Sequence, residues 1–211
     1  MPSGNAAPPT LADLSELGHL FGRDPIDVDR VADIYVELLN EIAPGWDDDP
    51  HMVDTPSRAA KFWRDFIDYD PGRVATAFPI GSVRVDQVVA VTGIRTWSLC
   101  AHHLLPFNAT IDVGYIASGK VLGLSKFARL AHLAAHRPTS QEAIVETLAN
   151  LVEEATGSRD VAVTASGTHL CMTMRGVAEQ DASMTTSVLR GAFRKEPDVR
   201  EEWFSIRAGS R

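Results

Sequence analysis

Two short segments of the chain hold side chains that can bind a metal ion. The first contains Cys100, His102 and His103, with C-x-x-H spacing between Cys100 and His103, and the second contains His169 and Cys171. Thiolate and imidazole are the ligands that zinc prefers in proteins. The chain has only these two cysteines. A disulfide between them is the alternative, but the nearby histidines favour metal binding in a cytosolic protein.

The number of protein ligands decides what such a site can do. Three ligands leave a coordination position open for water, as in catalytic zinc sites, whereas four close the site, as in structural ones. If Cys100, His103 and Cys171 bind the metal, His102 and His169 remain as acid or base groups. A histidine pKa of about 6.5 suits proton transfer near neutral pH. With His102 or His169 as a fourth ligand the site is closed, and spacing alone leaves both arrangements open.

The second segment has the alternation of a β-strand. A strand over residues 168–175 puts His169, Cys171 and Arg175 on one face, because successive side chains point to opposite sides. The apolar residues between them are then expected to face the core: Leu170, Met172 and Met174. This pattern predicts a polar, metal-capable face backed by an apolar one.

A basic helix start offers a candidate phosphate site. The segment 123–126 precedes a predicted helix, and Arg129 lies three residues beyond Lys126. A helix N-terminus that carries lysine and arginine attracts phosphate. The alternative is a solvated helix start with ordinary surface charges, which the motif alone favours. Three further basic residues can join this cluster: Arg58, Lys61 and Arg175.

Gln141 and Glu142 open another predicted helix. A carboxylate at this position is favourable for the helix dipole, and without other information that explanation is sufficient. The alternative is ligand recognition, because a carboxylate accepts two parallel N–H bonds, such as those of a guanine edge.

Composition and charge restrict the class of partner. The 211 residues carry a net charge of −8, which argues against nucleic acid as the main partner, since phosphate backbones attract basic proteins. No apolar run approaches the roughly 18 residues that a membrane span needs. The first ten residues contain no basic residue and no apolar stretch of the kind found in signal peptides. We therefore expect a cytoplasmic protein that contacts neither nucleic acid nor membrane.

The predicted elements give an α+β fold with a largely antiparallel sheet and helices on one face. Its exposed sheet edges need a partner, which predicts an oligomer, for example a ring. We expect a disordered segment over residues 1–25, a helical region over 26–72 and a larger domain over 73–211. The periodicity predicts helices at 27–43, 56–68, 125–136, 140–156 and 198–207. It predicts strands at 83–91, 94–100, 107–115, 160–166 and 168–175.

Five ordered motifs from about residue 26 to the C-terminus resemble the GTP cyclohydrolase I family. They are Asp54–Arg58, Ser98–Phe107, Gly123–Lys126 with Arg129, Arg137–Pro138 with Gln141–Glu142, and His169–Met172 with Met174–Gly176. The resemblance implies the tunnelling fold (T-fold), with 73–211 as its catalytic domain, and a homodecamer of two stacked pentamers with sites between subunits. The implied reaction converts GTP and water to 7,8-dihydroneopterin triphosphate and formate, a step of tetrahydrofolate biosynthesis.

The resemblance also implies a role for each matching residue. Zn²⁺ ligands are Cys100, His103 and Cys171, and the catalytic residues are His102, His169 and Ser125. Gln141 and Glu142 recognise guanine. The ribose triphosphate is held by Ser125, Lys126, Arg129 and Arg175, joined by Arg58 and Lys61.

One residue departs from the family pattern. Ala101 stands where the family usually has glutamate, between the cysteine and the two histidines. A carboxylate there could orient an arginine or stabilise an imidazolium. Its loss affects the multi-step reaction more than metal or GTP binding. The alternatives are a variant that stops at a formamidopyrimidine intermediate, a paralogue in secondary metabolism, or a nucleotide-binding regulatory subunit.

Overall fold

The computed structural model describes residues 24–209, apart from 73, 75–76, 80–86 and 119. Most of the segment expected to be disordered, and the beginning of the strand expected at 83–91, lie outside the described residues. The chain divides into two compact units, one within Glu16–Asp70 and one that contains Pro71–Arg211. Each unit is described by itself.

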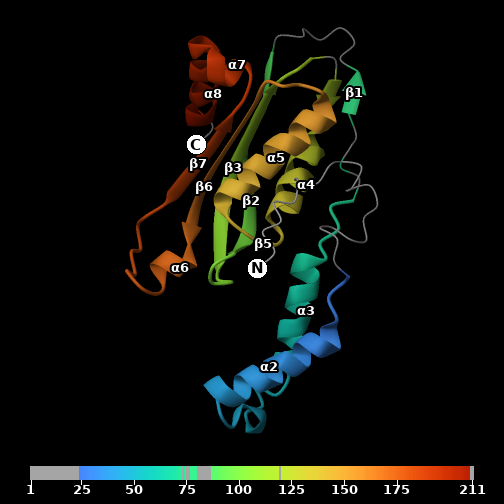
Figure 1. Cartoon of the computed structure of the whole chain (residues 1–211), viewed down its shortest axis with the longest axis vertical. Coiled ribbons are helices and arrows are strands. Elements are labelled where there is room, and N and C mark those ends of the chain that lie inside the picture. The colour runs from blue at the N-terminus through green and yellow to red at the C-terminus, as the bar shows by residue number, and fades with distance from the viewer. Residues whose placement is uncertain (1–23, 73, 75–76, 80–86, 119, 210–211) are drawn as a thin grey trace, which may run out of the picture. The chain divides into compact units, whose positions relative to one another are not determined.

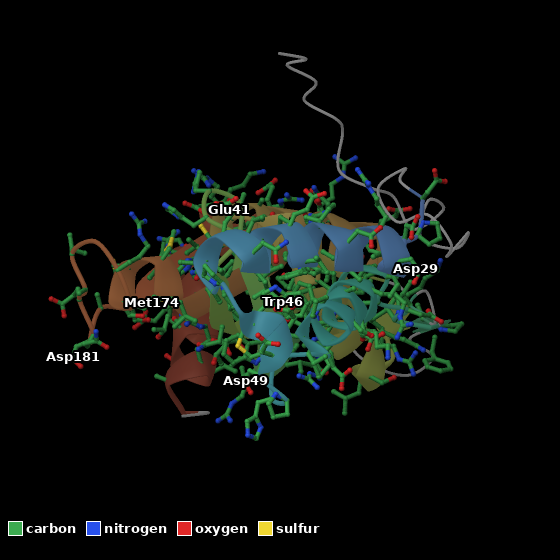
Figure 2. The ribbon with its side chains drawn as sticks, turned by 90° about the horizontal axis from the view of Figure 1, so that it is seen from below. Asp29, Glu41, Trp46, Asp49, Met174 and Asp181 are labelled. Carbon is green, nitrogen blue, oxygen red and sulfur yellow. The ribbon has the colours of Figure 1, made fainter. Side chains whose placement is uncertain are left out.

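The first unit is built from two helices, α2 (Val28–Ile42) and α3 (Thr55–Ile67), with a 3₁₀ turn η1 (Trp46–Asp48) between them. Asp27 caps α2 by accepting a hydrogen bond from the Arg30 amide. The Trp63 indole donates to the Tyr35 hydroxyl at 2.6 Å and so ties α3 to α2. Figure 2 shows α2 between Asp29 and Glu41. Both helices agree with the sequence prediction.

The second unit contains a five-stranded sheet in the order β5-β2-β3-β6-β7. Neighbouring strands are antiparallel except β5, which runs parallel to β2. Its strands are β2 (Val88–Cys100), β3 (Pro106–Ile116), β5 (Pro138–Thr139), β6 (Val161–His169) and β7 (Met184–Leu189). Two short strands, β1 (Ala77–Pro79) and β4 (Lys120–Leu122), pair separately. The antiparallel sheet was predicted, but the sequence did not predict β1, β4, β5 or β7.

The two strands expected before residue 100 form one long strand, β2, interrupted by a bulge between Val91 and Ile94. Gly93 lies in this bulge with φ of 76°, a backbone conformation that favours glycine. Its amide donates to the Asp112 carboxylate at 2.9 Å. The bulge bends β2 without ending it.

Helices α4 (Leu124–Ala135) and α5 (Gln141–Thr156) pack on one face of the sheet and bury the core. From β3, the fully buried side chains of Phe107, Ile111 and Tyr115 face them. Burial of these apolar side chains provides the main stabilisation of the layer.

The prediction of helices on one face only is wrong for the C-terminal helix. After a short helix α7 (Ala192–Lys195), α8 (Pro197–Gly209) packs on the opposite face of β3. Its Trp203 ring lies over Gly114, where an added Cβ would come within 2.6 Å of it. Arg207 donates to the Asp112 carboxylate at 2.8 Å. Gly114 and Asp112 alternate with the core residues of β3, so they point away from α4 and α5.

The strand predicted over 168–175 is also wrong. Strand β6 ends at His169, and residues Leu170–Thr173 form a one-turn helix, α6. The last pair that β6 makes with β3 joins His169 to Phe107. The next position of β3 is Pro106, which has no N–H to continue the ladder. Among the described helices, none combines the length and the apolar character that crossing a bilayer requires.

Candidate active site

The first metal-capable segment forms a tight loop between β2 and β3. The Cys100 amide donates to the Leu105 carbonyl at 2.9 Å, and the Leu104 amide donates to the Cys100 carbonyl at 2.8 Å. Leu104 closes the turn with φ of 54°, which is uncommon for a residue other than glycine. The Ala101 amide donates to the Thr139 carbonyl of β5 at 3.1 Å. Backbone bonds on both sides therefore fix this loop, while the side chains of Ala101 and His102 stay exposed.

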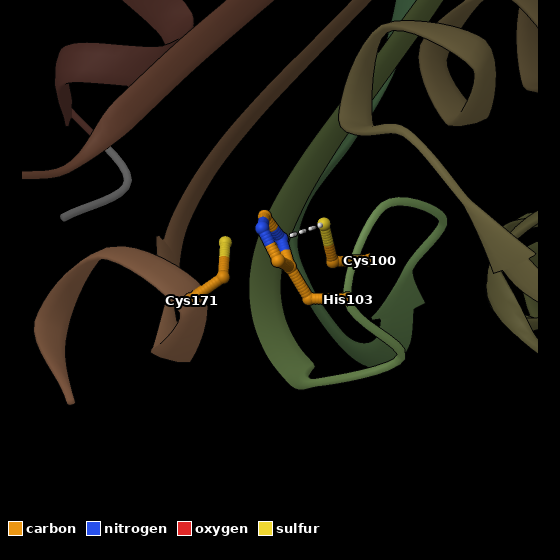
Figure 3. A group of neighbouring side chains, drawn as sticks. All are labelled: Cys100, His103 and Cys171. Atoms are coloured by element: carbon orange, nitrogen blue, oxygen red, sulfur yellow. Dashed lines mark hydrogen bonds between the residues drawn. The ribbon is translucent and has the colours of Figure 1, made fainter. Parts of the chain in front are cut away.

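Cys171 reaches the same place from α6. Figure 3 shows its sulfur facing His103, with Cys100 on the other side. One potential ligand atom from each of these residues lies within 4.8 Å of the other two. Cys100 is buried and His103 is exposed, so the group opens toward solvent on one side. Within the described part of the chain, no other group of three His, Cys, Asp or Glu residues meets this criterion.

The chemistry of this group fits a divalent cation. Both cysteines are free thiols. Burial raises the pKa of the Cys171 thiol, and hydrogen bonding and charge from Cys100 raise it further, while Arg175 opposes the shift. Two adjacent thiolates therefore repel each other without a cation between them. A bound metal ion removes this penalty and keeps coordinating thiols deprotonated. Two thiolates and an imidazole are a donor set suited to zinc.

His102 and His169 stand outside this three-member group. His102 Nδ1 lies 3.8 Å from the Cys100 sulfur. His169 ends β6, and its Nε2 is 3.1 Å from the Gln141 side-chain oxygen. Burial lowers the pKa of His169, and the nearby charge of Glu142 opposes the shift. Whether the metal has three protein ligands or four, and whether these two histidines transfer protons, stays a prediction.

The start of α4 contains part of the predicted phosphate site, and phosphate binding there stays a prediction. Gly123, the N-cap of α4, offers no side chain to the first N–H groups, and Ser125 is exposed beside it. Arg129 donates from its guanidinium to the Pro71 carbonyl. Gly72, with φ of 62°, leaves room for this guanidinium, which would lie 2.3 Å from an added Cβ. Arg129 is thus oriented by the segment at residues 71–72.

Comparison with known proteins identifies the family. Residues 31–207 match the family description GTP cyclohydrolase I. The GTP cyclohydrolase 1 of Rhodopirellula baltica is 39% identical over 181 residues, which cover 84% of this chain and 77% of that protein. The GTP cyclohydrolase 1 of Pseudoalteromonas translucida is 38% identical over 185 residues, covering 82% and 100%. This chain belongs to the GTP cyclohydrolase I family. It is therefore a hydrolase, and the resemblance in the motifs is confirmed.

A third relative gives the same result. The GTP cyclohydrolase 1 of Pseudoalteromonas atlantica is 41% identical over 158 residues, covering 74% of this chain and 85% of that protein. Because the similarity covers most of each chain, it includes both segments that form the cysteine and histidine group.

The other residues predicted to bind substrate lie in different parts of the structure and differ in exposure. Arg175 is exposed after α6, and its charge opposes the rise in the pKa of the Cys171 thiol. Arg58 and Lys61 belong to α3 in the other unit, where Arg58 donates to the His51 carbonyl at 2.8 Å. Their convergence with the rest of the site remains a prediction. Glu142 is exposed, whereas its neighbour Gln141 is fully buried.

Sequence reasoning missed two residues that shape the site. The Phe107 ring stacks on His169, with centroids 4.2 Å apart and planes 8° from parallel. The Thr139 carbonyl accepts from Ala101. Phe107 and His169 are cross-strand partners far apart in the chain, so only the strand register could have revealed their contact. Nothing in the local sequence marks the Thr139 carbonyl.

Proposed function

We propose that the protein converts GTP and water to 7,8-dihydroneopterin triphosphate and formate. The observation that carries the proposal is the convergence of Cys100, His103 and Cys171 from two distant segments in a member of this family. His169, which lies beside Glu142, contributes a basic group outside that convergence.

Zinc would be held by the thiolates of Cys100 and Cys171 and the imidazole of His103. Bound there, it supplies Lewis acidity that activates water near neutral pH. His102 and His169 move protons while the imidazole ring of guanine opens and formate leaves, because an imidazole nitrogen can both accept and donate a proton.

The other residues bind and orient the substrate. Glu142 is exposed and accepts two N–H bonds from the guanine edge. Ser125 and Lys126 lie in the first turn of α4, where the helix dipole favours phosphate. Arg129 and Arg175 add positive charge for the triphosphate, and Ser125 assists the rearrangement of the ribose before the pterin ring closes.

Arg58 and Lys61 of α3 would complete the triphosphate site in a ring-shaped homodecamer of the tunnelling fold. This assembly, the cytoplasmic location and a place in tetrahydrofolate biosynthesis are proposals that rest on the family. Sedimentation of the purified protein tests the assembly, because a monomer at micromolar concentration would contradict it.

The exposed Ala101 side chain supports a second candidate. It leaves a methyl group where the family usually has a carboxylate, without disturbing the Cys100–Leu105 loop. This change agrees with an enzyme that releases a formamidopyrimidine intermediate or serves secondary metabolism. It also agrees with a regulatory subunit that only binds nucleotide.

One assay separates these candidates. Zinc-loaded protein is incubated with GTP while formate is measured, and pterin is measured by its fluorescence after oxidation. Formate and pterin in equal amounts support the full reaction. Formate without pterin supports early release, and GTP binding without formate supports the regulatory subunit. The Cys171→Ser variant is the control for a contaminating cyclohydrolase.

A further inference from the structure

Gln141 has an environment unlike that of a substrate-binding side chain. It opens α5, but its side chain is fully buried beneath β6 and β7. Its amide nitrogen lies within 3.1 Å of three oxygens, which belong to Ala165, Met184 and Thr186. These contacts occupy the two N–H groups of the amide.

The same contacts fix which way the amide faces. If the oxygen and nitrogen were exchanged, the oxygen would face the Ala165 and Met184 carbonyls, which have no hydrogen to donate. The exchange would also lose the hydrogen bonds to these carbonyls, each worth about 0.5–1.5 kcal/mol. The oxygen of Gln141 therefore faces His169, whose Nε2 lies 3.1 Å away.

The His169 ring also has an aromatic neighbour. Phe107 stacks on it at 4.2 Å between centroids. Gly167 permits the close approach of Gln141, since a Cβ there would lie 2.5 Å from the Gln141 oxygen. Among the described residues, the ring thus contacts the Phe107 face and the Gln141 oxygen.

We propose that Gln141 is a positioning residue that keeps the proton of neutral His169 on Nε2. An amide oxygen can only accept, so Nε2 must donate, and Nδ1 is left as the ring nitrogen that can take a proton. Given the proposed cyclohydrolase function, Nδ1 is the atom through which His169 exchanges protons during the reaction. Recognition of the guanine edge then falls to the Glu142 carboxylate, because the Gln141 amide is already engaged.

The tautomer can be observed directly. Solid-state NMR of zinc-loaded protein containing ¹⁵N-histidine distinguishes protonated from unprotonated ring nitrogens, and the His169→Asn variant identifies the His169 signals. At a pH where His169 is neutral, we expect a protonated Nε2 and an unprotonated Nδ1. An unprotonated Nε2 in the wild-type protein would overturn the proposal. This measurement needs no turnover, so it stands or fails independently of the proposed function.

A near-isosteric variant tests the consequence. Gln141→Met removes the acceptor while filling the same space. We expect the two tautomers to become mixed and kcat to fall about 10–100-fold, as when an orienting partner is lost, with KM for GTP changed less than twofold. A large rise in KM with the tautomer retained would instead assign Gln141 to guanine binding and overturn the proposal.

Two matched variants complete the design. Thr186→Val removes one partner of the amide nitrogen but keeps both carbonyl acceptors, so the His169 tautomer should be unchanged. Glu142→Gln should raise KM without altering the tautomer. If Thr186→Val mixes the tautomers as strongly as Gln141→Met, general loosening of the core explains the effect and the proposal is wrong.

Discussion

Two regions deliver the three candidate metal ligands, and they are built differently. The loop between β2 and β3 supplies Cys100 and His103 and is closed by backbone hydrogen bonds within the loop and to β5. The segment after β6 supplies Cys171 from the single turn of α6. It leaves the sheet, and α6 is held both by its contacts with β3 and β6 and by hydrogen bonds from the residues that follow it.

The hydrogen bonds come from the exposed segment after α6, on which Figure 2 labels Met174 and Asp181. The Gln180 side-chain amide donates to the Thr173 carbonyl at 2.6 Å. The Glu179 amide donates to the Met172 carbonyl at 3.1 Å. The loop after β2 should therefore tolerate most side-chain changes and resist changes of backbone conformation, whereas α6 should be sensitive to the loss of one side chain.

The largest expected effect is a difference in zinc retention between variants of Cys171 and of His169. Cys171→Ser should lose zinc on dialysis and lose activity, because the hydroxyl is a poor substitute for a thiolate. His169→Ala should retain zinc while kcat falls about 10²–10⁴-fold, the usual contribution of a general acid or base. Metal analysis of the dialysed proteins, with circular dichroism as a check of folding, measures the contrast. Equal zinc loss in both variants would make His169 a ligand.

The two regions also differ in how far sequence could predict them. The proximity of Cys100 and His103 was predictable because they are three residues apart, and local spacing implies local proximity. The segment 169–175 has the alternation of a strand, and alternation predicted one. Pairing with β3 decided otherwise, since the ladder ends where β3 reaches Pro106. A strand's length depends on its partner, which its own sequence does not contain.

Dependence on partners distant in the sequence also explains why the positions of the C-terminal helix and of the Gln141 side chain were not predicted. Trp203 indicates an apolar side of α8. Only its contact with Gly114, which has no side chain, shows that α8 covers the second face of the sheet. The motif put Gln141 beside Glu142 as an equal partner. Their different burial results from the orientation of α5 over β6 and β7, a tertiary property.

A change of backbone conformation should damage the loop after β2. Leu104 has positive φ and a side chain that is 51% exposed, so a substitution there acts mainly through the backbone. Leu104→Val, which is β-branched, should bind zinc more weakly than Leu104→Gly by about 1–2 kcal/mol. Leu104→Gly adopts this φ without strain and is the matched control. Competition with a chelator gives both affinities, and a valine variant that binds as tightly as the glycine variant would contradict the argument.

A smaller effect is expected from the tie that holds α6. Gln180→Ala leaves the Thr173 carbonyl without its donor and should weaken zinc binding by about 0.5–1.5 kcal/mol, the net value of one hydrogen bond. Glu179→Ala keeps the backbone bond to Met172 and removes only an exposed side-chain contact with Asp181. Chelator competition should therefore detect a change in the first variant alone. Similar losses in both would mean that the whole segment, rather than Gln180, positions α6.

The smallest effect on zinc is expected at Ala101, although the residue lies between the candidate ligands. Its side chain is exposed, and its amide bond to the Thr139 carbonyl does not depend on the side chain. Ala101→Glu should therefore change zinc affinity by less than about 0.5 kcal/mol, as surface substitutions usually do. It should still raise the ratio of pterin to formate if the missing carboxylate limits the later steps, with Ala101→Ser as the control. Loss of zinc from the glutamate variant would show that the loop depends on this side chain, contrary to the distinction between the two regions.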